Sequence, residues 1–242
     1  MSATDNQLSQ ITEEKIAVAD AASDLVESGM RVGLGTGSTA LFVIHALAKR
    51  LRNGALHDLA MVPTSTQAQL VCWEQGLTLS TLSDPVIAGS LDITIDGADE
   101  VDSSWNLIKG GGGALLNEKI VARASGRYVI AVNEYKLVPR LGVNTPVPVE
   151  VVPFALAPVK SAIEEFGYRA ELRLAVRKQG PVMTDNGNMI IDAWAPPNFD
   201  AVKGEIDLIQ IPGVVENGLF TRCVTDLFVG SSIHGVNHKR RK

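Results

Sequence analysis

Cysteine is scarce in this sequence: Cys72 and Cys223 are the only two among 242 residues. They form no Cys-x-x-Cys pair and no Cys/His cluster, so neither a disulfide framework nor a structural zinc site is expected, and a reducing compartment is the natural setting. Long apolar runs are missing too, because the best one, residues 40–48, is too short to span a bilayer. Residues 1–15 are polar and acidic, unlike a secretory signal or an Arg-rich transit peptide. We therefore expect a cytoplasmic protein without membrane contact.

The chain also lacks an excess of positive charge, since its formal net charge at pH 7 is −5. That balance gives no support to nucleic-acid binding. The single basic run, residues 238–242, is expected to be a frayed, solvated tail. The four histidines match no catalytic pattern, and we expect them to be structural or surface residues: His45, His57, His234 and His238.

In the first half of the chain, short apolar strands alternate with helices. The segments with the composition of buried strands are 30–34, 59–62, 77–79, 91–95 and 127–132. Helical periodicity marks the segments 13–28, 40–52, 65–76 and 114–125. Such alternation indicates a mostly parallel, Rossmann-like sheet covered on both faces.

Beyond Pro146 the pattern changes. Predicted strands are 147–152, 169–176, 181–184, 189–193 and 214–220, and predicted helices are 155–166 and 201–209. Asn186-Gly187 is a strong hairpin signal, and the order β-α-β-β-α-β matches a ferredoxin-like unit. Residues 224–229 have the composition of a strand that returns to the first sheet. We therefore predict an α/β protein in which a Rossmann-like domain of residues 1–146 and 221–242 carries an inserted, smaller ferredoxin-like α+β domain of residues 147–220.

The first candidate binding loop is GTGSTA, residues 35–40, between a predicted strand and a predicted helix. Glycines allow a ligand to approach the backbone closely, and the N–H groups at a helix start favour an anion. The loop supplies hydroxyl donors at Thr36, Ser38 and Thr39. Its spacing also fits a permissive dinucleotide fingerprint, but the next strand ends in Pro63 instead of the acidic residue that a ribose would need. A phosphate site is therefore favoured over a dinucleotide site.

The second loop is DGADE, residues 96–100, at the carboxyl end of an apolar strand, where open α/β sheets bind ligands. Carboxylates so close together repel one another, so they can differ in how readily each binds a proton, as acid/base chemistry requires. An Asp-Gly turn with solvated charges is the alternative. A metal site is not favoured, because no histidine accompanies the loop and the spacing is not that of a calcium loop.

The third loop is KGGGGALLNEK, residues 109–119. Four successive glycines are costly in chain entropy, and close approach to a ligand accounts for them better than a flexible linker does. Glu118 is expected about one turn inside the helix that follows, with a surface glutamate beside a surface lysine as the alternative. Lys109 is positioned to stabilise negative charge on a substrate oxygen.

These three motifs, in this order, resemble those of ribose-5-phosphate isomerases of the A type. Residues 148–151, 182–188 and 211–215 resemble that family too, whereas the last dozen residues do not, and we assign them no role. The resemblance implies that Glu118 is the proton acceptor, that no metal or cofactor takes part, and that Lys15 aligns with a basic residue near the substrate phosphate. The residues that match substrate-binding positions are Thr36, Gly37, Ser38, Thr39, Asp96, Gly97, Ala98, Asp99, Lys109, Gly110, Gly111, Gly112 and Lys136.

The resemblance thus predicts interconversion of ribose 5-phosphate and ribulose 5-phosphate in the non-oxidative pentose phosphate pathway. Moving the carbonyl between C1 and C2 requires a base that removes a proton next to it and returns that proton to the neighbouring carbon. Our hypothesis is that Glu118 is this base, that Asp96 or Asp99 assists ring opening, and that Lys109 stabilises the enediolate. The family also implies a homodimer or homotetramer, with the small domain at the interface.

Two other readings compete with this one. An amino-sugar-phosphate deaminase or a coenzyme A transferase on a similar scaffold is the nearer competitor, since a transferase uses a glutamate as nucleophile. A non-enzymatic sugar-phosphate sensor is less favoured, because such regulators usually carry a DNA-binding helix-turn-helix ahead of the sensor domain, and too few residues precede the first strand to supply one. A pure binding module would also have little use for a base at Glu118.

Overall fold

The computed structural model describes residues 3–241, with side chains from residue 8 onward. The chain is divided into two compact units. The first consists of the described residues of Met1–Gly97, Ile120–Lys136 and Cys223–Lys242, and the second of Ala98–Lys119 and Leu137–Arg222. Among the described helices, none combines the length and the hydropathy that a membrane span requires.

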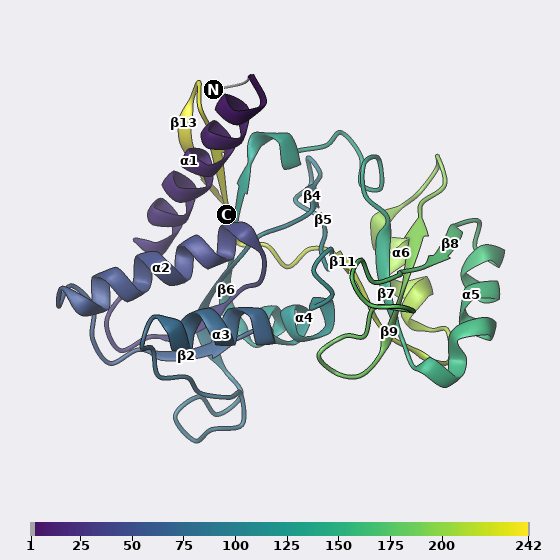
Figure 1. Ribbon diagram of the computed structural model, residues 1–242, viewed down its shortest axis with the longest axis horizontal. Coiled ribbons are helices and arrows are strands. Elements are labelled where there is room, and N and C mark those ends of the chain that lie inside the picture. Colours follow the sequence, from purple (N-terminus) through teal and green to yellow (C-terminus); the bar gives the residue numbers. More distant parts are fainter. Residues whose placement is uncertain (1–2, 242) are drawn as a thin grey trace. The chain divides into compact units, whose positions relative to one another are not determined.

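A six-stranded sheet forms the centre of the first unit, in the order β13-β12-β6-β3-β1-β2 (Figure 1). Its five parallel strands are β1 (Arg31–Leu34), β2 (Ala60–Pro63), β3 (Leu91–Asp96), β6 (Ser125–Asn133) and β12 (Asp226–Ser231). The antiparallel edge strand is β13 (Gly235–Arg240). The mostly parallel, Rossmann-like sheet is thus confirmed, together with the return of the chain to it near residue 226.

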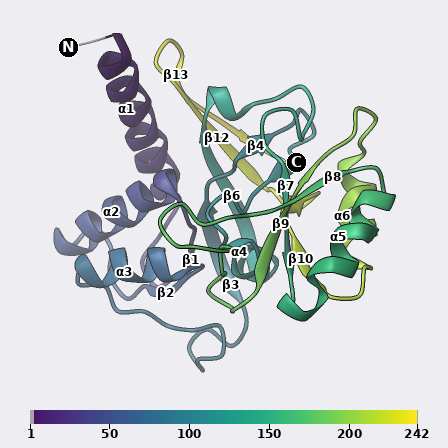
Figure 2. The same cartoon turned by 45° about the vertical axis from the view of Figure 1, so that its right-hand side comes forward.

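Three helices cover one face of this sheet: α1 (Ala3–Ser23), α2 (Ser38–Arg52) and α3 (Thr66–Glu74) (Figure 2). Val32 and Leu34 of β1 belong to the core that these helices form. Between them, Gly33 faces Val121 near the end of α4 (Leu115–Arg123), on the opposite face. Because successive strand residues point to opposite faces, a sheet covered on both sides needs apolar or small residues at nearly every position.

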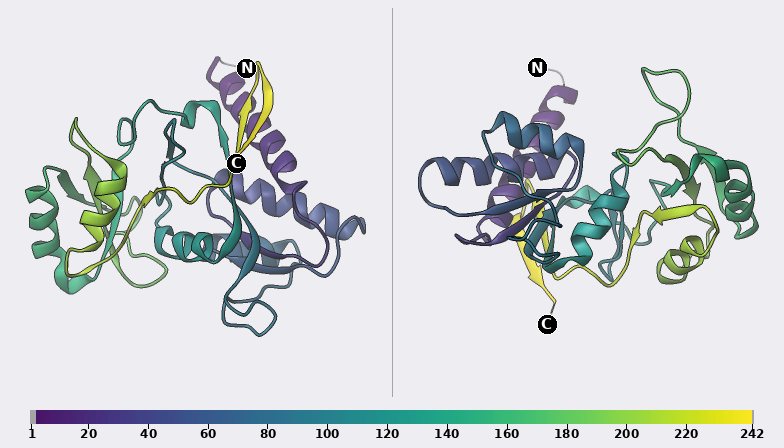
Figure 3. Two further views of the ribbon diagram at one scale, coloured as in Figure 1. Left: turned by 180° about the vertical axis from the view of Figure 1, so that it is seen from behind. Right: turned by 90° about the horizontal axis from the view of Figure 1, so that it is seen from below.

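The second unit contains a four-stranded antiparallel sheet, in the order β10-β7-β9-β8. Its elements are β7 (Val147–Val151), η2 (Pro153–Ala155), α5 (Leu156–Glu165), β8 (Arg169–Leu172), β9 (Met189–Trp194), α6 (Ala201–Ile209) and β10 (Val214–Asn217). The chain order is the predicted β-α-β-β-α-β, so the ferredoxin-like pattern is confirmed. Figure 3 shows α5 and α6 on the same side of this sheet, where Val159, Ile163 and Leu208 pack against Val149 and Ile191.

A small antiparallel sheet in the second unit was not predicted from the sequence. It consists of β4 (Glu100–Val101), β5 (Leu107–Ile108) and β11 (Leu219–Phe220). The predicted strand 214–220 is instead two strands, separated at Gly218. There the N–H of Gly218 donates to the carbonyl oxygen of Pro148 (2.7 Å), and its own carbonyl accepts from the N–H of Lys109 (2.9 Å), so the chain passes from one sheet to the other.

Other predicted boundaries were wrong. Helix α1 ends at Ser23, short of the predicted residue 28, because the N–H groups of Leu25 and Val26 bond three residues back and tighten the chain into turns. The predicted strands 77–79 and 181–184 form only isolated bridges.

The basic tail is not frayed as far as it is described, because residues 235–240 form β13. The His238 ring stacks on Phe228 at a centroid distance of 4.0 Å, and its Nε2 atom lies 2.9 Å from an Asp226 oxygen. The structural role expected for His238 is therefore confirmed. Lys242 lies outside the described residues.

Candidate active site

Asp96 holds the first glycine loop at the carboxyl edge of the sheet in the first unit. Its Oδ1 atom accepts hydrogen bonds from the backbone N–H groups of Thr36 (3.1 Å) and Gly97 (2.7 Å). A Cβ atom at position 35 would lie 2.6 Å from the Cα atom of Asp96, so only glycine allows the two segments to come this close. The structure therefore brings together residues 35–40 and the start of the DGADE loop, with Asp96 only 1% exposed.

The end of β2 adds two hydroxyl groups that sequence analysis did not single out. The Thr36 hydroxyl lies 2.7 Å from the hydroxyl oxygens of Thr64 and Ser65. Since β2 lies beside β1, the rule that ligands bind at the carboxyl ends of parallel strands was the available signal for them.

A lysine of the first unit lies at the start of α2. Lys15 on α1 donates a hydrogen bond from Nζ to the hydroxyl of Ser38 (2.8 Å), the first residue of α2. Burial lowers the pKa of Lys15, and the charge of Lys136 at the end of η1 (Glu134–Lys136) lowers it further. An ammonium group beside the N–H groups of a helix start forms a site suited to an anion such as a phosphate. Thr39, also predicted here, is 9% exposed on the first turn of α2.

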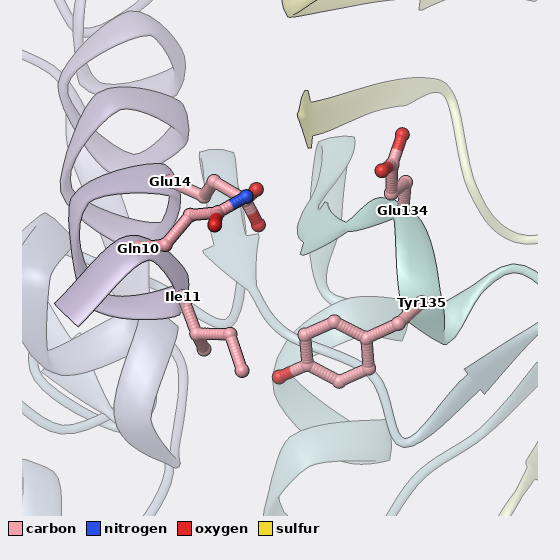
Figure 4. Close-up of a pocket in the computed structure, with 5 residues that line it drawn as sticks. All are labelled: Gln10, Ile11, Glu14, Glu134 and Tyr135. Carbon is pink, nitrogen blue, oxygen red and sulfur yellow. The ribbon is translucent and has the colours of Figure 1, made fainter. Parts of the chain in front are cut away.

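A cavity of about 410 Å³ lies between α1 and η1 in the same unit (Figure 4). Its lining residues are Gln10, Ile11, Glu14, Glu134 and Tyr135. None of them is a predicted site residue. Burial acts to raise the pKa of Glu14, but hydrogen bonds from Asn133, Ser232 and Gln10 hold it below its ordinary value. The carboxylates make this cavity unsuited to a phosphate, in contrast to the neighbouring surface at Lys15 and Lys136.

A buried ion pair marks the second unit. The Nζ atom of Lys109 lies 3.0 Å from Oε1 of Glu118, and the two residues are 2% and 4% exposed. Glu118 is in the first turn of α4, as predicted, and Lys109 directly follows β5. Burying two charged groups has a desolvation cost of roughly several kcal/mol per ion, which their mutual attraction offsets. Because the burial is costly, such a pair is a candidate for a functional role. The alternative of a surface glutamate is wrong.

The glycine run after Lys109 is held by Asp99. The N–H of Gly111 donates to Oδ2 of Asp99 (2.8 Å), and the N–H of Gly113 donates to the carbonyl oxygen of Gly110 (2.9 Å). Gly110 has a φ of 98°, which favours glycine, while Gly111 and Gly112 are exposed. The second unit thus brings together Asp99, Lys109, the glycines and Glu118, and Ala98 begins this unit half-buried.

The other charges of these motifs have structural partners. Glu100 is 1% exposed and accepts hydrogen bonds from the backbone N–H groups of residues 142, 144 and 145. Lys119 lies within 3.3 Å of Glu205 and 2.9 Å of Glu216. Among the side chains that are described, those of residues 8–241, no three of His, Cys, Asp or Glu lie together as a metal ion would need.

Comparison with known proteins places these features in a family. The profile of ribose 5-phosphate isomerase A (phosphoriboisomerase A) matches residues 60–233. The chain is 48% identical to ribose-5-phosphate isomerase A of Thermosynechococcus vestitus over 225 residues, which cover 93% of this chain and 94% of that protein. The chain belongs to the ribose 5-phosphate isomerase A family.

Solved structures of ribose 5-phosphate isomerases have the same fold. The enzyme of Methanocaldococcus jannaschii superimposes with a TM-score of 0.89 at 43% identity, covering 95% of this chain and 99% of that one. A D-ribose-5-phosphate isomerase in complex with phospho-erythronic acid superimposes with a TM-score of 0.90 at 41% identity, covering 96% of this chain and 99% of that one.

Proposed function

We propose that this protein interconverts ribose 5-phosphate and ribulose 5-phosphate in the pentose phosphate pathway, with Glu118 as the proton-transferring base. The observation that carries the proposal is the buried pair of Lys109 and Glu118 at the start of a helix launched by glycines. The related isomerase with bound phospho-erythronic acid, a small phosphorylated sugar acid, supports the same class of substrate.

The chemistry requires an open-chain sugar. The Glu118 carboxylate takes the proton from C2 of the aldose, and the electron pair moves through C1 onto the carbonyl oxygen O1. A proton then passes from O2 to O1, and protonated Glu118 returns its proton to C1, which leaves the carbonyl at C2. An ammonium group 3.0 Å from Glu118 stabilises the carboxylate that begins the cycle, and it is available to the developing enediolate. A positioned base supplies about 10²–10⁴-fold in rate, and positioning and electrostatics supply the rest.

The phosphate is assigned to the first unit. Lys15 and Ser38 lie at the start of α2, where ammonium, hydroxyl and backbone N–H groups all favour a dianion, and the charge of Lys136 acts on Lys15.

Asp96 and Asp99 differ as candidates for ring opening. Asp96 is 1% exposed, and one of its oxygens accepts hydrogen bonds from the backbone N–H groups of Thr36 and Gly97. Asp99 also uses one oxygen for the backbone, at Gly111, but it is partly exposed. The accessible Asp99 is therefore favoured for proton exchange with the ring oxygen, and Asp96 for holding the loop.

A direct assay tests the proposal. Ribose 5-phosphate and the purified protein are incubated in D₂O with a chelator, and ribulose 5-phosphate formation and deuterium at C1 and C2 are followed. Isomerisation predicts conversion together with solvent deuterium at these carbons. Transfer of coenzyme A between carboxylic acids, or release of ammonia from an amino-sugar phosphate, would instead support the competing enzymes.

We also propose a cytoplasmic homodimer or homotetramer, with residues 147–220 as a separate domain at the interface. Large apolar side chains exposed on the second unit support the assembly, among them Phe154, which is 98% exposed, and Ile206, which is 53% exposed. Light scattering of the purified protein tests the assembly, and Phe154→Glu is expected to weaken it.

A further inference from the structure

An arginine outside the predicted site contacts the glycine run. Arg173 follows β8 directly, and its Nη1 atom donates to the carbonyl oxygens of Gly110 (2.9 Å) and Gly111 (3.1 Å). Its own backbone is fixed, because its N–H donates to the carbonyl oxygen of Ile190 and its carbonyl accepts from Val182, each at 2.9 Å. All of these residues belong to the second unit.

Asp192 on β9 holds the guanidinium in place. Nε of Arg173 lies 2.9 Å from Oδ2 of Asp192, and Nη2 bonds to Oδ1 of the same carboxylate. This two-bond geometry fixes the plane of the guanidinium and leaves Nη1 directed at the glycines. The two side chains are only 16% and 19% exposed, so water competes with the pair weakly.

The peptide group between Gly110 and Gly111 is held at both ends. Its carbonyl oxygen accepts from Arg173, and its N–H donates to Asp99 at 2.8 Å. The next peptide group has its carbonyl, on Gly111, bonded to Arg173 as well. Because a trans peptide directs its N–H opposite to its carbonyl, the N–H of Gly112 points away from Arg173. Gly112 is exposed, so this part of the loop is accessible to a ligand.

We propose that Arg173 is a positioning residue for the isomerisation, which fixes the peptide planes of the glycine run and so aims its N–H groups at the substrate. The proposal rests on the proposed function. Four consecutive glycines have many accessible conformations, and holding them in one before substrate arrives removes an entropic cost from the transition state. Arg173 does not touch the substrate in this scheme, and acts through the loop.

Arg173→Ala tests the proposal, with Arg169→Ala as the matched control. Arg169 begins β8, the strand that Arg173 follows, and pairs with Glu171, but it is exposed and its described contacts do not include the glycines. We expect Arg173→Ala to lower kcat by roughly 10- to 100-fold with a smaller rise in KM, and Arg169→Ala to leave both within about twofold of wild type. Added guanidinium chloride, below denaturing concentrations, is expected to restore part of the lost kcat, which a merely destabilised protein would not show.

Hydrogen exchange of the segment 107–118 gives a readout that does not depend on activity. We expect faster exchange there in Arg173→Ala than in wild type and Arg169→Ala. If Arg173→Ala does not fold, Asp192→Asn keeps the side-chain shape while removing the ion pair, and the same two changes are expected.

The outcomes separate this proposal from the proposed function. Wild-type protein without isomerase activity would refute the proposed function, and with it the catalytic part of this inference, even if exchange in the loop changes. An active wild type whose Arg173→Ala variant keeps its kcat, or shows no rescue by guanidinium and unchanged exchange, would overturn the role of Arg173 alone.

Discussion

A Cβ atom at position 218 would lie only 2.2 Å from the carbonyl oxygen of Lys109. Gly218 and Lys109 are also joined by a backbone hydrogen bond of 2.9 Å, so the segment after β10 supports the residue that pairs with Glu118. No side chain fits between the two backbones.

Gly218→Ala is therefore expected to destabilise the protein and to displace Lys109. The free energy of unfolding, measured by urea denaturation, should fall by roughly 1–3 kcal/mol, because a backbone must shift to admit the methyl group. Gly126→Ala is the control, since a Cβ there would meet its nearest atom at 3.4 Å, and a change within about 0.5 kcal/mol is expected. Equal losses in both variants would contradict the close-approach argument.

Glu118→Gln should retain the fold and lose most of its turnover. The amide keeps the size of the carboxylate but accepts no proton from carbon, so we expect kcat to fall by about 10²–10⁴-fold, measured by ribulose 5-phosphate formation. The circular dichroism spectrum should not change. A variant with near-normal kcat would remove Glu118 from the mechanism.

Asp96→Asn and Asp99→Asn should differ in a way that depends on the direction of the reaction. Ribulose 5-phosphate has no ring to open, because its O5 carries the phosphate. A residue needed only for ring opening therefore matters more for ribose 5-phosphate as substrate. We expect Asp99→Asn to slow the aldose-to-ketose direction more than the reverse in initial-rate measurements, and Asp96→Asn to slow both directions similarly. The opposite pattern would exchange the two roles.

Asp226 should contribute to resistance against acid. Burial acts to raise its pKa, but hydrogen bonds from Arg127, His238 and Thr225, with the charge of Arg127, hold the pKa below its ordinary value. The stabilisation is therefore fully present above about pH 4, the unfolded-state pKa, and is lost as pH falls through the lower folded-state value. Unfolding midpoints in urea, measured between pH 6 and pH 2, should fall less steeply below pH 4 in Asp226→Asn than in wild type. Parallel curves would contradict this role.

Cys72 should be unreactive in the folded protein. It is fully buried, and burial raises the pKa of its thiol to about 11, so little thiolate is present near neutral pH. A chromogenic disulfide reagent at pH 8 should therefore modify Cys72 only after urea is added, as peptide mapping would show. Rapid modification in native conditions would indicate local opening around α3.

Much of the fold was predictable because its signals are local. Alternating strands and helices in the first unit, and the Asn186-Gly187 turn before β9, depend on residues that are close in sequence; Gly187 has the expected positive φ, 78°. The short strands at Glu100 and Leu107 were missed, since two residues carry no periodicity, and Leu219–Phe220 was predicted as part of the strand 214–220 because its partner in β5 is far away in sequence. The edge strand β13 was missed because its residues are polar and exposed.

In the candidate site, too, the features with local sequence signals were predicted and the others were not. Glycine runs and a glutamate near a helix start are visible in the sequence, and the structure places Glu118 and Lys109 in contact as expected for a shared role. Arg173 and Asp192 were not found, because an arginine at the end of a strand carries no local signal and its glycine partners are 62 and 63 residues away.

The edge strand β13 has a consequence for work with this protein. It covers the otherwise open side of β12, and its charged residues Lys239 and Arg240 discourage a further strand from adding there. A shortened version ending before Gly235 would leave the unsatisfied hydrogen-bonding groups of β12 and the uncovered ring of Phe228 facing solvent, and would be prone to self-association in concentrated solution.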